Sequence, residues 1–160
     1  MVVMFLERIQ MDIYIGKAMG YTTTFIGSLR TSKNLSEQQL EKLNRIQITR
    51  HNYTEFPSIW NNWEVVVRYS LDGGHHLQWN GGEKFYNYVE WLKYLIDNYF
   101  EPWGITLSGM ITYIGEDKSD YGVIECEEKS NFDKGIVETQ VGVYELSDPE
   151  FVKRLIKEVK

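Results

Sequence analysis

The sequence predicts an α+β domain in which helices cover one face of an antiparallel sheet. Three observations predict this class: β-branched and aromatic segments, two amphipathic helical segments between them, and tight-turn residues between neighbouring strands. The predicted order of strand, helix, strand, strand, helix, strand is that of a ferredoxin-like βαββαβ core. A β-meander and a C-terminal helix are expected to extend this core. We expect residues 19–160 to form one domain, preceded by an N-terminal extension (residues 1–18) with no assigned structure.

Length, cysteine content and hydropathy limit the class of protein. The chain has 160 residues, enough for one domain with its own hydrophobic core. Its single cysteine, Cys126, has no second cysteine with which to form a disulfide, and this favours a reducing compartment. No apolar run approaches the roughly 20 residues that cross a bilayer. We therefore expect a cytoplasmic protein that does not bind membranes.

The first half of the domain is predicted as strand, helix, strand and strand. Residues 21–29 are β-branched and aromatic, which is typical of a strand. Ser36 and Gln39 have the spacing of a capping box and are expected to open a helix. Residues 63–69 and 75–79 are predicted to pair as a hairpin, because an Asp-Gly-Gly turn lies between them.

The second predicted helix is rich in aromatic residues and begins directly after residue 79. Gly81 and Gly82 form a turn, and Glu83 in the first helical turn complements the positive end of the helix dipole. The helix is expected to continue to Phe100, because Pro102 follows it. Apolar residues at three- and four-residue steps predict its buried face: Phe85, Tyr88, Val89, Leu92, Leu95, Ile96 and Tyr99.

Three strands and a helix are predicted in the rest of the chain. Residues 105–114, 121–127 and 136–144 have the composition of strands and are expected to form the meander. Ser147 and Glu150 then match a second capping box ahead of an amphipathic final helix.

Negative charge is concentrated in one segment. The net charge of the chain is −6, and between Gly115 and Glu138 eight acids are opposed by three lysines, which leaves −5 in this segment. Direct binding to nucleic acid through a broad basic face is therefore not expected. Six of these acids form the candidate partner-binding surface: Glu116, Asp117, Asp120, Glu125, Glu127 and Glu128.

Two interpretations of the acidic strand remain open. Glu125 and Glu127 share one face because side chains alternate along a strand, and Glu128 lies on the other face. The charges could simply protect an exposed strand from aggregation. They could instead present phosphate-like charge to a protein that binds nucleic acid.

The acids of the loop before this strand allow a further hypothesis. Glu116, Asp117 and Asp120 form either a solvated turn or a Mg²⁺ or Ca²⁺ site, which would suit a metal-dependent hydrolase. Their spacing does not fit an EF-hand. His75 and His76 are adjacent in a predicted strand and point to opposite faces, so they are expected to be a polar hairpin tip rather than metal ligands. We expect no metal site and no cofactor.

Aromatic residues supply two more candidate sites. Tyr86, Trp91 and Tyr94 lie outside the apolar stripe of the aromatic helix, where they either pack against the terminal segments or bind a partner. A nucleotide or signalling molecule is the alternative ligand, because a helix N-terminus offers N–H groups to an anion. That alternative site would consist of Tyr21, Trp79, Gly81, Gly82 and Glu83.

Several segments together resemble a small family of bacterial and phage proteins. The resemblance is carried by Gly-Tyr-Thr-Thr at 20–23, by the aromatic segment 80–96, by Pro-Trp-Gly at 102–104 and by Gly-Glu-Asp at 115–117. Where the family has Cys-Gln-Trp, this chain has Asn-Asn-Trp at 61–63. The resemblance implies a small accessory protein linked to phage, which would then act in the host cytoplasm, and it implies no activity.

These observations favour a non-enzymatic binding protein. The sequence has no nucleophile-elbow, P-loop or dinucleotide motif. By analogy with small acidic phage proteins, we expect an inhibitor of a bacterial defence nuclease, as anti-CRISPR proteins are. The expected partner is a host nuclease or another nucleic-acid-binding protein. An uncovered strand edge could also support a homodimer.

Overall fold

The computed structural model describes residues 20–68, 74–117, 119–146 and 157. Its elements in chain order are β1 (Thr24–Thr31), α2 (Glu37–Ile48), β2 (Trp63–Val67), β3 (His75–Trp79), α3 (Tyr88–Leu95), the π-helix η1 (Ile96–Phe100), β4 (Leu107–Ile114), β5 (Tyr121–Asn131) and β6 (Ile136–Glu145). The predicted N-terminal extension, the centre of the β2–β3 turn and the predicted C-terminal helix lie outside the described residues.

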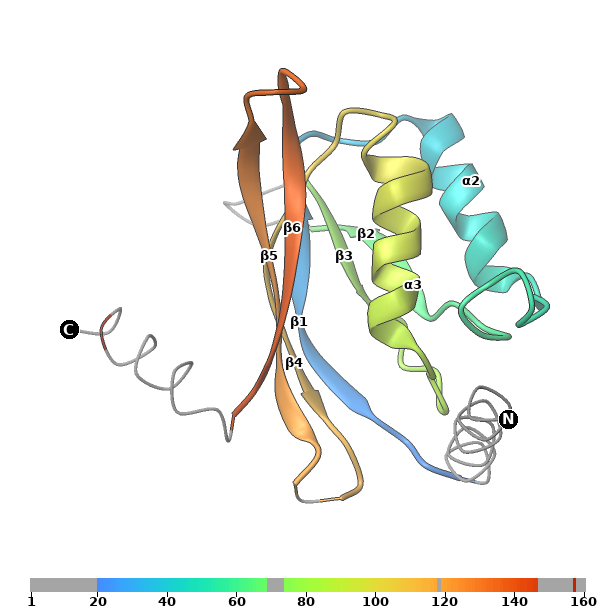
Figure 1. Cartoon of the computed structure of the whole chain (residues 1–160). Helices are drawn as coiled ribbons and strands as arrows, with labels where there is room; N and C mark the ends of the chain where they lie inside the picture. Colours follow the sequence, from blue (N-terminus) through green and yellow to red (C-terminus); the bar gives the residue numbers. More distant parts are fainter. Residues whose placement is uncertain (1–19, 69–73, 118, 147–156, 158–160) are drawn as a thin grey trace, which may run out of the picture.

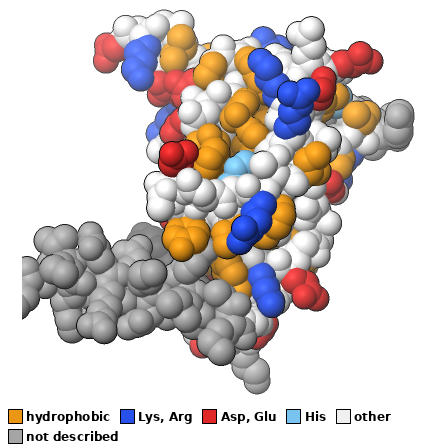
Figure 2. Space-filling view, turned by 90° about the vertical axis from the view of Figure 1, so that its right-hand side faces the viewer, with side chains coloured by type: hydrophobic (Ala, Val, Ile, Leu, Met, Phe, Trp, Pro, Cys, Tyr) orange, Lys and Arg blue, Asp and Glu red, His pale blue; other side chains and the backbone are white. Residues whose placement is uncertain are grey.

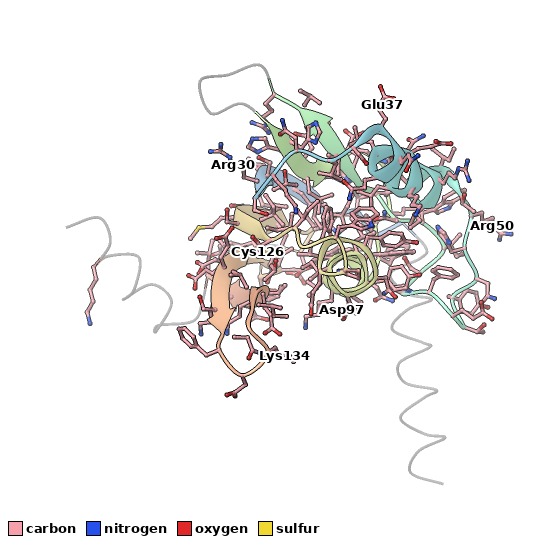
Figure 3. All side chains as sticks on the ribbon, turned by 90° about the horizontal axis from the view of Figure 1, so that it is seen from above. Arg30, Glu37, Arg50, Asp97, Cys126 and Lys134 are labelled. Carbon is pink, nitrogen blue, oxygen red and sulfur yellow. The ribbon has the colours of Figure 1, made fainter. Side chains whose placement is uncertain are left out.

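The strands form one antiparallel sheet with the order β2-β3-β1-β4-β5-β6. β1 is therefore central, with β3 on one side and β4 on the other. Both α2 and α3 lie against one face of this sheet (Figure 1), and the view from above shows them on the same side (Figure 3). We call the opposite face of the sheet the open face. The predicted α+β class is confirmed.

Aromatic rings form the centre of the core beneath α3. Phe25 of β1 meets Trp63, Phe85 and Tyr88 at ring-centroid distances of 5.2, 5.8 and 4.8 Å, all close to edge-to-face. Such contacts add to the stabilisation that comes from burying the rings. The expected apolar stripe of the aromatic helix does pack inward, since Leu92 and Leu95 are buried.

Two glycines allow β1 and β4 to approach. Gly27 of β1 has φ +109°, and a Cβ there would lie 2.5 Å from the Met110 carbonyl oxygen. Gly109 of β4 has φ +131°, and its Cβ would lie 2.8 Å from the Ser28 carbonyl oxygen. Both positions thus require glycine for conformation and for space. They lie where the central strand meets the β4–β6 meander.

The capping box predicted for the first helix is confirmed. The Ser36 hydroxyl accepts a hydrogen bond from the Gln39 N–H at 3.2 Å, and the Gln39 side chain accepts one from the Ser36 N–H at 2.9 Å. Leu43 and Ile46 of α2 are buried against the sheet. The box provides an acceptor for an N–H group that a helix start leaves without an intrahelical partner.

The expected start of the aromatic helix is wrong. Helix α3 begins at Tyr88, because Lys84 (φ 58°) and Asn87 (φ 51°) are left-handed and interrupt any earlier turn. The segment is held instead by the loop before β2: the Asn87 side chain donates to the Pro57 carbonyl at 2.6 Å, and Ser58 Oγ donates to the Tyr86 carbonyl at 3.0 Å. The helical stretch does reach Phe100, as predicted, but as a π-helix from Ile96.

Replacing the capping serine should weaken α2 measurably. Ser36→Ala is expected to lower the free energy of unfolding by about 1 kcal/mol, because the Gln39 N–H loses its acceptor. Gln38→Ala is the matched control, since Gln38 is exposed in the same first turn but outside the box. Urea denaturation followed by circular dichroism measures both. Equal stabilities for Ser36→Ala and Gln38→Ala would contradict the capping role.

Candidate functional site

The open face of the sheet carries a patch of exposed apolar side chains over β1, β4 and β5. Its members are Ile26, Met110, Ile114 and Tyr121, with exposed fractions of 60, 41, 43 and 40%. Ile114 lies directly opposite Tyr121 in the β4–β5 ladder. Ile26 lies opposite Thr112, and is therefore diagonal to Met110 and Ile114 on the same face. We call these four residues the open-face patch.

Acidic residues lie at both ends of the open-face patch. Ile114 and Tyr121 are the last and first residues of strands joined by a short loop, and this loop carries the exposed Glu116 and Asp117. Glu127 is exposed further along β5, on the same face as Tyr121 by strand alternation. The patch therefore combines an apolar centre with a negative rim, the usual composition of a protein-binding surface.

The six acids predicted as one surface do not lie together. Glu125 is only 6% exposed, so it is not part of an acidic surface in this fold. Glu127 and Glu128 are exposed on opposite faces of β5, as alternation predicts. The Glu128 carboxylate accepts a hydrogen bond from Thr106 Oγ1 at 2.6 Å, which ties it to the segment before β4. Of the six, Glu127 and the loop acids accompany the open-face patch.

The loop acids are held by the segment that leads into β1. The Tyr21 hydroxyl donates to the Asp120 carboxylate, and Glu116 accepts from the Thr22 N–H at 2.6 Å. Asp117 accepts from the Ser119 N–H and hydroxyl at 3.0 and 2.9 Å, and these hydrogen bonds lower the pKa of Asp117. The carboxylates are thus each engaged by protein donors.

The described residues do not support the metal-dependent hydrolase. No group of three or more His, Cys, Asp or Glu side chains among them is placed to hold one ion. The histidines are also not a polar hairpin tip, because His75 and His76 are both buried. His75 Nδ1 accepts from the Leu35 N–H at 2.8 Å, and His76 Nδ1 lies 3.1 Å from Ser28 Oγ.

The aromatic candidates are placed differently from expectation. Trp91 is fully buried, so the prediction that it lies outside the core is wrong. Its indole N–H donates to Ser58 Oγ at 2.6 Å, and its ring packs on His51 and Phe56 at centroid distances of 5.2 and 6.1 Å. The loop between α2 and β2 provides this cover, whereas the terminal segments expected to do so lie outside the described residues. No periodic pattern in the sequence indicates this contact.

Tyr86 and Tyr94 remain half-buried beside the same loop. The Tyr94 ring contacts Phe56 at 5.5 Å and Trp91 at 5.5 Å. Figure 2 shows the helix-covered side of the molecule, where hydrophobic side chains are interspersed with charged ones of both signs. The loop acids and Glu127 lie instead on the β4–β5 loop and the open face of β5, so the predicted aromatic and acidic candidates do not form one surface.

The alternative ligand site loses its anion-binding groups. Its argument needs a helix N-terminus at Gly81–Glu83, but α3 begins at Tyr88. The Gly82 N–H donates to Asn80 at 2.8 Å, and the Gly82 carbonyl accepts from the Trp79 indole at 3.0 Å. Trp79 also packs edge-on against Phe25 at 5.6 Å. The turn is consequently engaged in its own contacts, and Tyr21 is bonded to Asp120 instead.

A cavity of about 230 Å³ lies between α2 and β2. Leu43, Trp63 and Leu77 are among its apolar lining residues, and Asn44 and Gln47 of α2 add amide groups. Binding sites for small molecules usually enclose about 300–1,000 Å³. This cavity is smaller than that range, and none of the residues of the alternative ligand site lines it.

Cys126 is a packing residue in the core. It is 2% exposed, and burial followed by the nearby Glu125 raises the pKa of its thiol to about 12. A thiol with so high a pKa is a poor nucleophile at neutral pH. This environment is that of a packed side chain rather than a reactive nucleophile.

Comparison with known proteins adds no information on the site. No protein-family model, curated protein or solved structure matches this chain. Within the described residues, no helix has the length and apolarity needed to cross a membrane.

The stability of the fold should decrease as the pH rises above 10. Burial, with a further contribution from Asp120, raises the pKa of Tyr88 well above its ordinary value of 10.0. The unfolded state therefore loses this proton first. The stabilising contribution is complete below pH 10 and is lost as the pH rises toward the folded-state pKa.

Urea denaturation between about pH 8 and pH 11 tests this prediction. The pH dependence should become shallower in Tyr88→Phe, whereas Tyr53→Phe is the control because Tyr53 is exposed. An unchanged slope for Tyr88→Phe would assign the alkaline loss of stability to other groups.

Cys126 should resist alkylation while the protein is folded. Iodoacetamide at neutral pH is expected to modify it at least about tenfold more slowly than in urea, because the thiol is buried and its pKa is raised. Mass spectrometry of the intact chain measures the modified fraction over time. Equal rates in buffer and in urea would show that the thiol is accessible.

Proposed function

We propose that this chain is a non-enzymatic protein-binding module that acts through the open-face patch and its acidic rim. The single observation that supports this most is the exposure of Ile26, Met110, Ile114 and Tyr121 on adjacent strands of one sheet face. Apolar side chains gathered on an exposed surface mark interaction sites. A rigid sheet also presents them with little conformational cost on binding.

The acidic rim specifies the chemistry of the partner. Glu116 and Asp117 border the patch at the β4–β5 loop, and Glu127 follows along β5. Arg30 and Lys129 lie on β1 and β5 toward the opposite end of the sheet, so the negative charge is greatest at the loop end. The partner should therefore present apolar side chains beside lysine or arginine.

Basic surfaces with adjoining apolar side chains are common in proteins that hold nucleic acid. We propose a nuclease or another nucleic-acid-binding protein as the partner, with the carboxylates occupying positions that phosphates would take. Inhibition of a bacterial defence nuclease is the specific form of this proposal. The support for it is the charge distribution of the open face.

The order of the strands also supports a proposal about the topology of the sheet. We infer that β1 to β4 with α2 and α3 form a ferredoxin-like βαββαβ unit to which β5 and β6 are added. The support is that β1 pairs with both β3 and β4, that β2 lies outside β3, and that both helices lie on one face. Neither α2 nor α3 lies on the open face of such a unit.

The proposal is tested with proteins captured from bacterial lysate by the immobilised chain. Captured proteins that bind nucleic acid are purified, and their affinity is measured by calorimetry. Ile26→Ser and Glu127→Lys should each weaken binding about tenfold, which corresponds to about 1.4 kcal/mol. Glu55→Lys is the matched charge control, because Glu55 is exposed in the loop between α2 and β2.

Two results would overturn the proposal. One is capture of no nucleic-acid-binding protein at micromolar concentrations of the chain. The other is binding that is equal for the wild type, Ile26→Ser and Glu127→Lys. Supporting binding should also weaken with salt, because exposed charges contribute to it.

A further inference from the structure

The longer edge of the sheet is the outer side of β6. The two edge strands are β2, with five residues, and β6, with ten. Among the described residues, β6 pairs with β5 alone, in a ladder that runs from Ile136 to Glu145. The β5–β6 hairpin also extends beyond the ends of α2 and α3 (Figure 1). In the view from above, Lys134 in its turn lies at the end of the sheet farthest from Glu37 of α2 (Figure 3).

β6 has few of the features by which proteins block an edge strand. It contains neither proline nor lysine, and its pairing with β5 is continuous over its whole length. Three of its β-branched side chains are exposed, at Ile136, Val137 and Val143. Of its two glutamates, Glu145 is the last residue of the strand. Glu138 is drawn back toward the turn, since its carboxylate accepts from Asn131 at 3.1 Å and from Lys134 at 3.3 Å.

We propose that β6 pairs antiparallel with β6 of a second copy of this chain. Backbone N–H and C=O groups of successive residues point to alternate sides of a strand. Residues that face each other across the interface must therefore be an even number of positions apart. The two-fold axis consequently passes beside one residue, which faces its own copy. Placing the axis at Gln140 keeps positions 136–144 of both copies within the ladder. In this register Val137 faces Val143 of the second copy, and Thr139 faces its Val141.

This register suits the side chains on both faces. The valines at positions 137 and 143 lie on the helix side of the sheet, where strand alternation places them with Val141. On the open face, Ile136 meets Tyr144 of the second copy. Glu138 meets Gly142, so no carboxylate stands opposite another carboxylate. The exposed β-branched side chains thus gain cross-strand partners without a like-charge contact.

The paired sheets would contain twelve strands, since each copy contributes six, with a two-fold axis perpendicular to the combined sheet. Residues opposite each other in an antiparallel pair point to the same face, so both open-face patches would lie on one side of the dimer. The dimer would therefore offer two equal surfaces in one plane. This inference does not depend on the proposed function, because it concerns the edge of the sheet and is measured on the chain alone.

Sedimentation equilibrium of the full chain tests the interface. Between roughly 1 and 100 µM the wild type should change from monomer to dimer. The double variant Val137→Lys with Val143→Lys places lysines opposite each other and should remain a monomer. The double variant Val137→Lys with Val143→Glu places opposite charges at the same contact and should recover the dimer.

A control variant and a disulfide define the register. Ile48→Lys should leave the dimer unchanged, because Ile48 is exposed on α2. Gln140→Cys should form a disulfide-linked dimer on mild oxidation, because position 140 faces itself across the axis. Cys126 is buried and should not contribute to this product.

Three results would overturn the inference. They are a wild type that stays monomeric over the whole concentration range, a dimer that persists with lysine at both valine positions, and failure of Gln140→Cys to cross-link. Circular dichroism of each variant establishes that it is folded. All of these measurements detect association of the chain with itself, so they are distinguishable from any failure to bind another protein.

Discussion

The structure depends on one constraint: β1, the first strand in sequence, must occupy the centre of the sheet. The rings of Trp63, Phe85 and Tyr88 all contact the Phe25 ring of β1. They come from β2, from the segment before α3 and from the first residue of α3. Gly27 permits the close approach of β4 on the other side. If β1 were displaced, the aromatic core, the β2–β3 hairpin and the β4–β6 meander would lose their common contact.

Helices α2 and α3 cover one face of the sheet. The other face and the outer edges therefore include side chains that are exposed to solvent. On the open face this produces exposed apolar residues such as Ile26 and Ile114, with carboxylates beside them. Strand β6 is a ten-residue edge strand that, among the described strands, pairs with β5 alone. Helices α2 and α3 do not extend over β6, which explains why Val137 and Val143 are exposed although they lie on the helix side.

Local sequence patterns predict the elements well and the site poorly. The capping box at Ser36 depends on residues three apart, so it is evident from the sequence. The start of α3 is not, because Asn87 is held by Pro57, thirty residues away. The burial of Trp91 has the same origin in the loop before β2. Glu125 and Glu127 share a face as predicted, but only tertiary packing decides that one is buried.

The central position of β1 has a consequence during synthesis. Thr31 at its end is 44 residues away in sequence from His75, whose carbonyl it contacts in β3. At about 5–20 residues per second, translation takes roughly 2–9 s to produce that partner. Strand β1 is therefore synthesised before either of its neighbours in the sheet. The backbone hydrogen bonds of α2 are local and can form in the meantime. The early exposure of β1 gives chaperones a defined segment to protect until β3 and β4 arrive.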